Sequence, residues 1–229
     1  MDGRPENDSA EAREERLSGL VHAYATALLA GDEVGAELAI REALDAKLST
    51  AEIDDGIIAP ALWLVGEMWE RGEISVADEH LATEISLRVL ALQREARRTT
   101  RERGRRRVLL ATPPGEQHVV ALRMIGNLLR EAGYDVLMLG PDVPADALAA
   151  SARSYRPDVV CLSSTMVGGA DKVAVCIDEV RQLWPGAGFV VGGRALHHGF
   201  RARPGIELCR RVSEVVESVD AVVKHAHLN

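Results

Sequence analysis

One histidine stands at a point in the chain where a ligand would be expected to bind. His118 ends the loop 112–118, Thr-Pro-Pro-Gly-Glu-Gln-His, which follows the apolar run 108–111. An imidazole at this place can coordinate a metal ion. If the run 108–111 is the first strand of an open parallel sheet, the loop lies at the edge where such sheets place their ligands. A lone histidine can also be an ordinary surface or core residue. The loops predicted to lie beside it distinguish between these possibilities.

Two further loops carry residues that suit a large ligand. The loop at 163–165 reads Ser-Ser-Thr and follows the apolar run 159–162, and the loop at 192–194 reads Gly-Gly-Arg and follows the run 189–191. Small hydroxyl residues and paired glycines let a ligand come close to the backbone. No GxGxxG motif follows the first run and no P-loop motif is present, so neither a dinucleotide nor a nucleoside triphosphate is indicated.

The elements that must position these loops are short strands alternating with helices. Apolar runs occupy 108–111, 136–139, 159–162 and 189–191, with 206–209 as a candidate fifth strand. Helical patterns such as 119–132 and 172–183 separate them, and 213–224 reads as a last helix. This alternation indicates βαβ units and a parallel sheet covered on both faces. The second half of the chain is therefore predicted to be a flavodoxin-like, Rossmann-type domain.

The first half of the chain shows no convincing strand. Its apolar positions recur every three or four residues, which predicts helices over 17–28 and 38–48. Ser49 and Glu52 resemble a capping box that opens a third helix, and Ser75 and Asp78 open a fourth. Short connections between four such helices favour an antiparallel bundle.

An arginine-rich segment separates the two halves. Eight of the fourteen residues at 94–107 are Arg. We expect a four-helix bundle over 10–101, a linker over 102–107 and the Rossmann-like domain over 108–229. The segment itself reads as a solvated helix end, because cations suit the last turn of a helix, or else as an anion or partner site.

Composition narrows the class of protein. The 229 residues include 47% hydrophobic and 27% charged residues, with a formal net charge of −8 that argues against a protein built to hold nucleic acid. No apolar run is long enough for a membrane span and the polar first residues lack a signal-peptide core, so we expect a cytoplasmic protein. The three cysteines are widely spaced and are expected to be buried free thiols.

The three loops together carry a specific resemblance. The motif Glu116-x-His118-x-x-Ala121, followed by Ser163-x-Thr165 and Gly192-Gly193, resembles the cobalamin-binding domain of methionine synthase, corrinoid methyltransfer proteins and B12-dependent mutases. The resemblance implies that His118 is the lower cobalt ligand and that the nucleotide tail of cobalamin enters a slot beside the sheet. Ser163 and Thr165 would meet that tail, and the two glycines would leave room for it.

This chain departs from the usual DxHxxG motif at two positions. Glu116 stands where Asp is commoner, and Ala121 stands in place of the last Gly. Glu116 can still accept a hydrogen bond from the second ring nitrogen and so fix the tautomer of a metal-bound histidine. Ala121 adds one methyl group beside the predicted slot.

The helical half resembles the cap of CarH-type photoreceptors. Trp69, Val76, Glu79 and His80 form a W-x6-V-x2-E-H pattern across the turn between the third and fourth helices. Val76, Glu79 and His80 share one helix face, although a core Trp with solvated neighbours would give the same pattern. By the resemblance, Trp69 covers the adenosyl group of adenosylcobalamin, Val76 packs against it and Glu79 hydrogen-bonds its sugar or base.

The resemblance implies a B12-dependent sensor rather than an enzyme. Adenosylcobalamin would lie between cap and Rossmann-like domain, and light-driven loss of the adenosyl group would change conformation or assembly. Only about fifteen polar residues precede the first helix, whereas CarH-type transcription factors begin with a helix-turn-helix domain, so we expect action through a partner, within a homodimer. The residue after Trp69 is Glu70 rather than the family's His, which leaves the light-state cobalt ligand open.

The sequence leaves three alternative functions open. A photocobilin would also bind biliverdin or another linear tetrapyrrole, with the 94–107 segment and His197-His198 facing its propionates or a dimer surface. These histidines, like His225 and His227, also read as exposed residues of a loop and a tail. A corrinoid protein that carries methyl groups between methyltransferases would share the same two-domain plan. A radical mutase subunit is less favoured because no substrate barrel is present.

Overall fold

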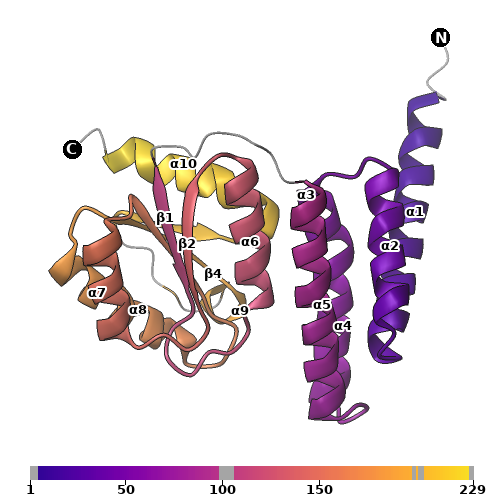
Figure 1. The fold of residues 1–229 in the computed structure, drawn as a ribbon, viewed down its shortest axis with the longest axis horizontal. Coiled ribbons are helices and arrows are strands. Elements are labelled where there is room, and N and C mark those ends of the chain that lie inside the picture. Colours follow the sequence, from indigo (N-terminus) through magenta and orange to yellow (C-terminus); the bar gives the residue numbers. More distant parts are fainter. Residues whose placement is uncertain (1–4, 98–105, 198–199, 201–203, 227–229) are drawn as a thin grey trace. The chain divides into compact units, whose positions relative to one another are not determined.

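The computed structural model describes residues 5–97, 106–197, 200 and 204–226, which form two compact units (Figure 1). The boundary between the units along the chain lies between Ala96 and Arg97, a few residues before the predicted linker at 102–107. Residues 98–105 lie outside the described part of the chain, so the exact linker bounds stay a prediction.

The first unit is helical, as predicted. Its elements are α1 (Pro5–Leu29), α2 (Glu33–Asp45), α3 (Thr50–Ile53), the π-helical segment η1 (Asp54–Ile58), α4 (Ala59–Glu70) and α5 (Val76–Ala96). The second predicted helix was too long, because α2 ends at Asp45 and buried Leu48 lies beyond it. The third predicted helix runs through α3, η1 and α4 without a break, and these elements with α1, α2 and α5 make a four-helix cap.

Both predicted capping signals form at the helix starts. At α3, Ser49 Oγ accepts from the Glu52 amide at 3.2 Å, and Glu52 Oε2 accepts from the Ser49 amide at 2.8 Å. At α5, Ser75 Oγ accepts from the Asp78 amide at 3.3 Å, and Asp78 Oδ2 accepts from the Ser75 amide at 2.9 Å. These reciprocal bonds satisfy amides that the first turn of a helix otherwise leaves without partners.

The interior of the cap contains a polar contact among apolar side chains. The fully buried Tyr24 of α1 donates a hydrogen bond at 3.0 Å to Ser86 Oγ of α5, and Ser86 in turn donates to the Ala82 carbonyl. Burial, with the nearby Asp54 adding to it, raises the pKa of Tyr24 to about 12 although the Ser86 hydrogen bond acts in the opposite direction. The phenol therefore stays neutral at physiological pH.

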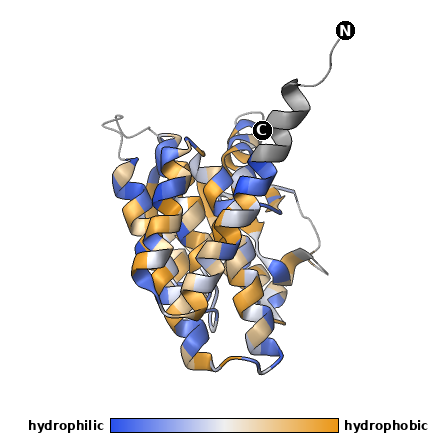
Figure 2. Cartoon of the chain, turned by 90° about the vertical axis from the view of Figure 1, so that its right-hand side faces the viewer, coloured by the Kyte–Doolittle hydropathy of each residue, from blue (hydrophilic) through white to orange (hydrophobic). Residues whose placement is uncertain are grey.

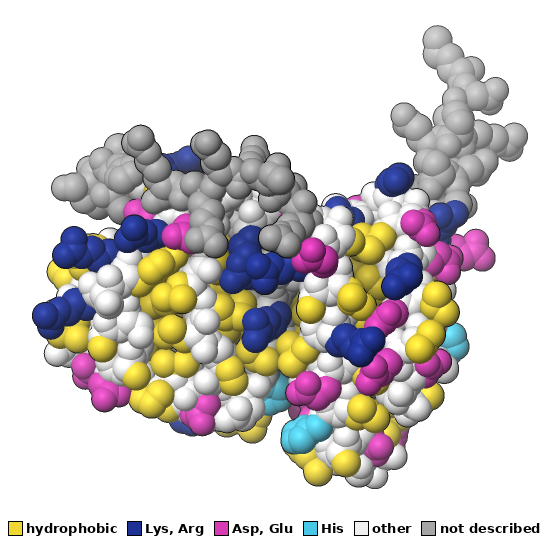
Figure 3. Space-filling view, in the orientation of Figure 1, with side chains coloured by type: hydrophobic (Ala, Val, Ile, Leu, Met, Phe, Trp, Pro, Cys, Tyr) yellow, Lys and Arg dark blue, Asp and Glu magenta, His cyan; other side chains and the backbone are white. Residues whose placement is uncertain are grey.

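The surface of the cap is mixed in character. Hydrophobic and hydrophilic residues alternate around its helices (Figure 2), and acidic and basic side chains are interspersed on the face shown in Figure 3. Among the residues that the structure describes, no helix has both the length and the apolar character that crossing a membrane requires.

The second unit is a parallel sheet with helices on both faces. Its elements are β1 (Arg107–Ala111), α6 (Val120–Glu131), β2 (Asp135–Gly140), α7 (Ala145–Tyr155), β3 (Val159–Ser163), α8 (Gly169–Leu183), β4 (Gly188–Gly192), α9 (Arg194–His197), β5 (Ile206–Cys209), a 3₁₀ turn η2 (Val212–Glu214) and α10 (Val215–Ala226). The strand order is β2-β1-β3-β4-β5, with all neighbours parallel. This is the flavodoxin-like order that the alternation of strands and helices predicted.

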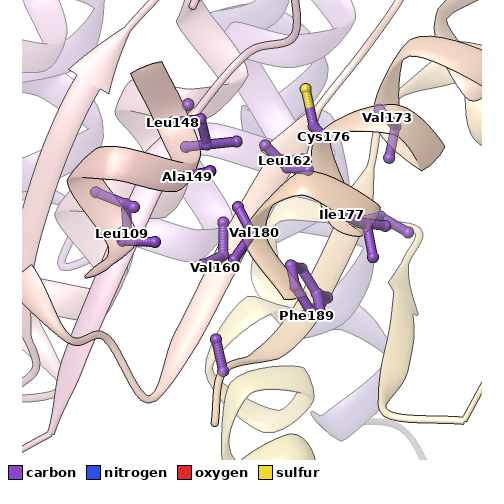
Figure 4. Packing of buried hydrophobic residues seen from close by; sticks show 14 of the residues in the cluster. Leu109, Leu148, Ala149, Val160, Leu162, Val173, Cys176, Ile177, Val180 and Phe189 are labelled. Atoms are coloured by element: carbon purple, nitrogen blue, oxygen red, sulfur yellow. The ribbon is translucent and has the colours of Figure 1, made fainter. Parts of the chain in front are cut away.

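Alternating side chains of the strands build a core on each side of the sheet. Leu109, Val160 and Phe189 pack with α7 and α8 on one face (Figure 4). On the other face, Leu110 lies against α6, and the missing side chain of Gly188 makes room for Val222 of α10. The prediction for the cysteines is confirmed: Cys161, Cys176 and Cys209 are all buried, and none of them forms a disulfide.

Candidate functional site

The carboxyl ends of β1 and β3 bring the predicted histidine and hydroxyl loops together through one carboxylate. Glu116, in the loop after β1, is only 2% exposed. Its Oε1 lies 2.6 Å from Nδ1 of His118 and accepts the His118 amide at 3.1 Å. Its Oε2 faces the loop that follows β3. Glu116 therefore binds the histidine with one oxygen and the neighbouring loop with the other.

The contacts to Oε2 come from three consecutive residues. Ser164 Oγ donates at 3.0 Å, and the amides of Thr165 and Met166 donate at 2.6 and 3.0 Å. Hydrogen bonds to a carboxylate favour its ionised form. Burial alone would raise the pKa of Glu116, but the bonds from His118, Met166 and Thr165 outweigh it and lower the pKa to about 2. The group is therefore a fixed negative charge at neutral pH.

This arrangement fits a histidine that ligates a metal centre. Because Glu116 engages Nδ1, a metal would be coordinated through Nε2, and the carboxylate would raise the basicity of the ring and fix its orientation. The His118 side chain is 47% exposed, so it is accessible from outside the domain. The substitution of Glu for the usual Asp is thus compatible with the second-nitrogen contact that the sequence predicted.

The glycine pair Gly192–Gly193, at the end of β4, lets two loops pack closely, which the sequence did not reveal. Gly193 has a φ of +100°, and a Cβ at this position would come within 2.2 Å of the Ser164 carbonyl oxygen. The two loops are bonded directly, since the Ser164 amide donates to the Gly192 carbonyl at 2.9 Å and the Ala195 amide donates to the Ser164 carbonyl at 3.2 Å. The space at Gly193 is therefore used by the backbone that positions Ser164.

The two predicted tail-binding residues lie beside this network. Ser163 is the last residue of β3, pairs with Gly192 in the sheet and is 6% exposed. Thr165 is half-buried and contributes its amide to Glu116. Their contacts to a nucleotide tail stay predictions. The role of Ser164 was missed, although its place as the middle residue of three hydroxyl residues was the signal available.

The predicted residues of the cap surround the turn between α4 and α5. Trp69 is 43% exposed and Val76 is 53% exposed. Glu79 is the most sheltered of the group: its Oε2 lies 2.6 Å from Nδ1 of the exposed His80, and its Oε1 accepts from the Thr83 hydroxyl at 3.2 Å. The alternative of a buried core Trp is therefore wrong, because Trp69 offers an exposed aromatic surface.

Several predicted features lie wholly or partly outside the described residues. These are residues 98–105 of the arginine-rich segment, the side chains of His197 and His225, and all of His198 and His227. Their predicted parts in a bilin site or a dimer surface stay predictions.

Two family models and several curated proteins match this chain. A family model described as a B12 binding domain matches residues 106–214, and a second model with the same description matches residues 20–92. The chain is 34% identical over 161 residues to the HTH-type transcriptional repressor CarH of Myxococcus xanthus, covering 69% of this chain and 50% of the repressor. It is 31% identical over 200 residues to the repressor CarA of the same organism, covering 86% and 63%.

The fold is also shared with a solved structure. The monomethylamine corrinoid protein of Methanosarcina barkeri matches with a TM-score of 0.73 and 14% identity, over 91% of this chain and 99% of that one. This identity supports the fold alone. With the two domain matches, the chain is a cobalamin- or corrinoid-binding protein that combines a helical B12-binding cap with a Rossmann-like B12-binding domain.

Proposed function

We propose that this chain is a B12-dependent photoreceptor that holds adenosylcobalamin between its cap and its Rossmann-like domain. The observation that carries the proposal is the Glu116–His118 pair, with Nδ1 and Oε1 2.6 Å apart, at the carboxyl edge of a sheet that matches a B12 binding domain. His118 would be the lower cobalt ligand through Nε2. Ser163, Thr165, Gly192 and Gly193 would line the path of the nucleotide tail.

The cap residues support the adenosyl form of the cofactor. Trp69 and Val76 present exposed apolar surface on either side of the α4–α5 turn, and an adenine or ribose face would bury it. Glu79 offers carboxylate oxygens that ribose hydroxyls can donate to, and His80 lies at hydrogen-bonding distance from it. In this proposal the four residues would contact the 5′-deoxyadenosyl group with aromatic, aliphatic and acidic side chains.

Light enters through the cofactor, which supplies a weak, light-sensitive cobalt–carbon bond when it is bound. The contribution of the chain is to make contacts with the adenosyl group that exist in one ligand state only. Loss of these contacts from Trp69, Val76 and Glu79 would change the relative free energy of cap conformations or assemblies. We propose that the change passes to a protein partner, within a dimer, and that the chain is not itself an enzyme.

The two repressors share only part of their length with this chain. The chain spans 50% and 63% of the lengths of the two repressors, so the transcriptional activity in their names is not carried over to it. Glu70 follows Trp69 in place of the family's histidine, so His80 or another cap residue would have to supply the upper ligand in the light state. If a bilin such as biliverdin binds, it does so as a second chromophore in addition to adenosylcobalamin.

The test compares dark and illuminated protein. The chain is purified with adenosylcobalamin, with methylcobalamin, or with adenosylcobalamin and biliverdin, and absorption spectra and light-scattering masses are recorded before and after illumination. We expect stronger retention of adenosylcobalamin and a light-dependent change in mass or hydrodynamic radius. His118→Ala should remove the histidine-ligated spectrum. Identical dark and light profiles, with equal retention of both cobalamins, would reject the photoreceptor.

A methyl-carrying corrinoid protein is the second candidate. One observation is compatible with it: Trp69 is 43% exposed and Val76 is 53% exposed, and a carrier must leave its upper cobalt face accessible to partner enzymes. The same absorption experiment separates the two, because a carrier retains methylcobalamin at least as well and shows no change of assembly in light.

A further inference from the structure

A carboxylate on the loop after β2 holds the histidine loop from the side opposite to Ser164. Asp142 lies in the loop 141–144, between β2 and α7. Its Oδ1 accepts the amide of Gly115 at 2.6 Å, and its Oδ2 accepts Nε2 of Gln117 at 3.2 Å. These donors come from the residues on either side of Glu116. The carboxylate therefore bridges two points of the segment that leads into His118.

The backbone of Asp142 adds a second set of contacts. Its amide donates to Thr112 Oγ1 at 2.9 Å and to the Glu116 carbonyl at 3.0 Å. The fully buried Thr112 hydroxyl donates onward to the same Glu116 carbonyl at 2.6 Å. The main chain of Glu116 is thus held from the β2 side, while its carboxylate is held from the β3 side.

The conformation of Asp142 indicates that these contacts determine it. Its φ of +54° lies in the left-handed region, which non-glycine residues occupy at a cost and mainly when surrounding contacts impose it. Asp is among the side chains that tolerate this region best. In this conformation the amide and the carboxylate of the same residue both reach the histidine loop.

We propose that Asp142 is a positioning residue for the predicted cobalt ligand, acting through the loop 112–118 rather than by touching the metal. The proposal rests on the proposed role of His118. Asp142 is exposed, so substitutions there open no cavity in the core. Its effect should appear in cobalamin binding only where the imidazole is present to be positioned.

A double-mutant cycle tests this. Affinity for methylcobalamin is measured by spectroscopic titration of the full chain with Asp142→Gly, His118→Ala and both changes together. Glycine adopts the left-handed backbone without strain and removes the carboxylate. We expect Asp142→Gly to weaken binding about fivefold in the chain that keeps His118, as for loss of a hydrogen bond of ordinary strength, and to have no effect in the His118→Ala chain.

Further variants separate positioning from a general structural effect. Asp142→Asn keeps an acceptor for Gly115 and should bind within about twofold of the native chain, because one ordinary bond is preserved. Gln117→Ala should show a weaker form of the same coupling. Asp146→Ala is the control. It removes a carboxylate close in sequence whose Oδ1 accepts from the Ala147 amide, and it should leave the affinity for methylcobalamin unchanged.

The outcomes are distinguishable. Equal losses for Asp142→Gly with and without His118 would overturn the positioning role and show instead a direct or general effect of the carboxylate. No loss in either background would overturn it as well. If His118→Ala alone keeps native affinity and the native cobalt spectrum, the proposed ligand is wrong, whatever Asp142 does.

Discussion

Glu116 and His118, two residues apart on one loop, face each other with Oε1 and Nδ1 separated by 2.6 Å. The same carboxylate accepts three donors from residues 164–166 through its other oxygen. The orientation of the imidazole is consequently coupled to a loop that lies about fifty residues further along the chain. This coupling sets the first prediction.

Glu116→Gln should destabilise the protein without cobalamin. An amide has one oxygen and one NH₂ group, so in either orientation the NH₂ group faces hydrogen-bond donors. We expect the free energy of unfolding to fall by about 1–3 kcal/mol, the usual cost of buried donors left without acceptors. Urea denaturation of the apoprotein measures it. Glu217→Gln, on the exposed side of α10, is the control and should lie within about 0.5 kcal/mol of the native chain.

Trp69→Ala should reduce the preference for adenosylcobalamin over methylcobalamin. If Trp69 covers the adenosyl group, its removal takes away an aromatic contact that methylcobalamin never makes. We expect about tenfold weaker binding of the adenosyl form, corresponding to about 1.4 kcal/mol, and little change for the methyl form. Trp63→Ala is a matched control on the same helix, with a side chain that is 71% exposed. Equal losses for both cobalamins would contradict the assignment.

Gly193→Ala should disrupt the link between the β3 and β4 loops. Its new Cβ would meet the Ser164 backbone at 2.2 Å, and its φ of +100° is already unfavourable for alanine. Gly140→Ala isolates the second effect, because Gly140 has the same φ and nothing within 4 Å of a Cβ. We expect about 1–3 kcal/mol of destabilisation at Gly140 and clearly more at Gly193 in thermal or urea unfolding. Similar values for both would mean that the loops separate at little cost.

Alkaline pH should destabilise the cap through Tyr24. The phenol has a pKa of about 12 in the folded chain, whereas an unfolded tyrosine titrates near 10, at about its ordinary value. The folded state therefore holds the proton more tightly. This stabilisation is complete below about pH 10 and is lost as the pH rises toward about 12.

Tyr24→Phe provides the comparison. It should cost about 1 kcal/mol near pH 8 through the lost bond to Ser86, and it should flatten the decline in stability between about pH 10 and 12. Urea unfolding of both chains at several pH values measures the two slopes. A parallel decline in the two chains would show that other groups control alkaline unfolding.

The sequence predicted most of the second unit because its signals are local. Short apolar runs between helical patterns placed β1 and β3 within one residue of their observed ends, and the parallel order followed from the alternation. The capping boxes at Ser49 and Ser75 were predictable for the same reason. In each case three or four neighbouring residues carry the information.

What the sequence did not show depends on contacts between distant residues. The bonds of Asp142 to Gly115 and of Ser164 to Glu116 join loops that are 27 and 48 residues apart in the chain. The π-helical turn at 54–58 and the end of α2 before Leu48 likewise reflect packing inside the cap rather than periodicity. Such features require the folded arrangement to be known.

Two of the three donors to Glu116 Oε2 are main-chain amides, from Thr165 and Met166. Every amino acid except proline supplies the same amide. The side chains at 165 and 166 can therefore vary to suit different ligands while the anchor of the histidine loop stays in place. In these two residues the main-chain amides anchor the histidine loop, and the side chains are left to determine ligand specificity.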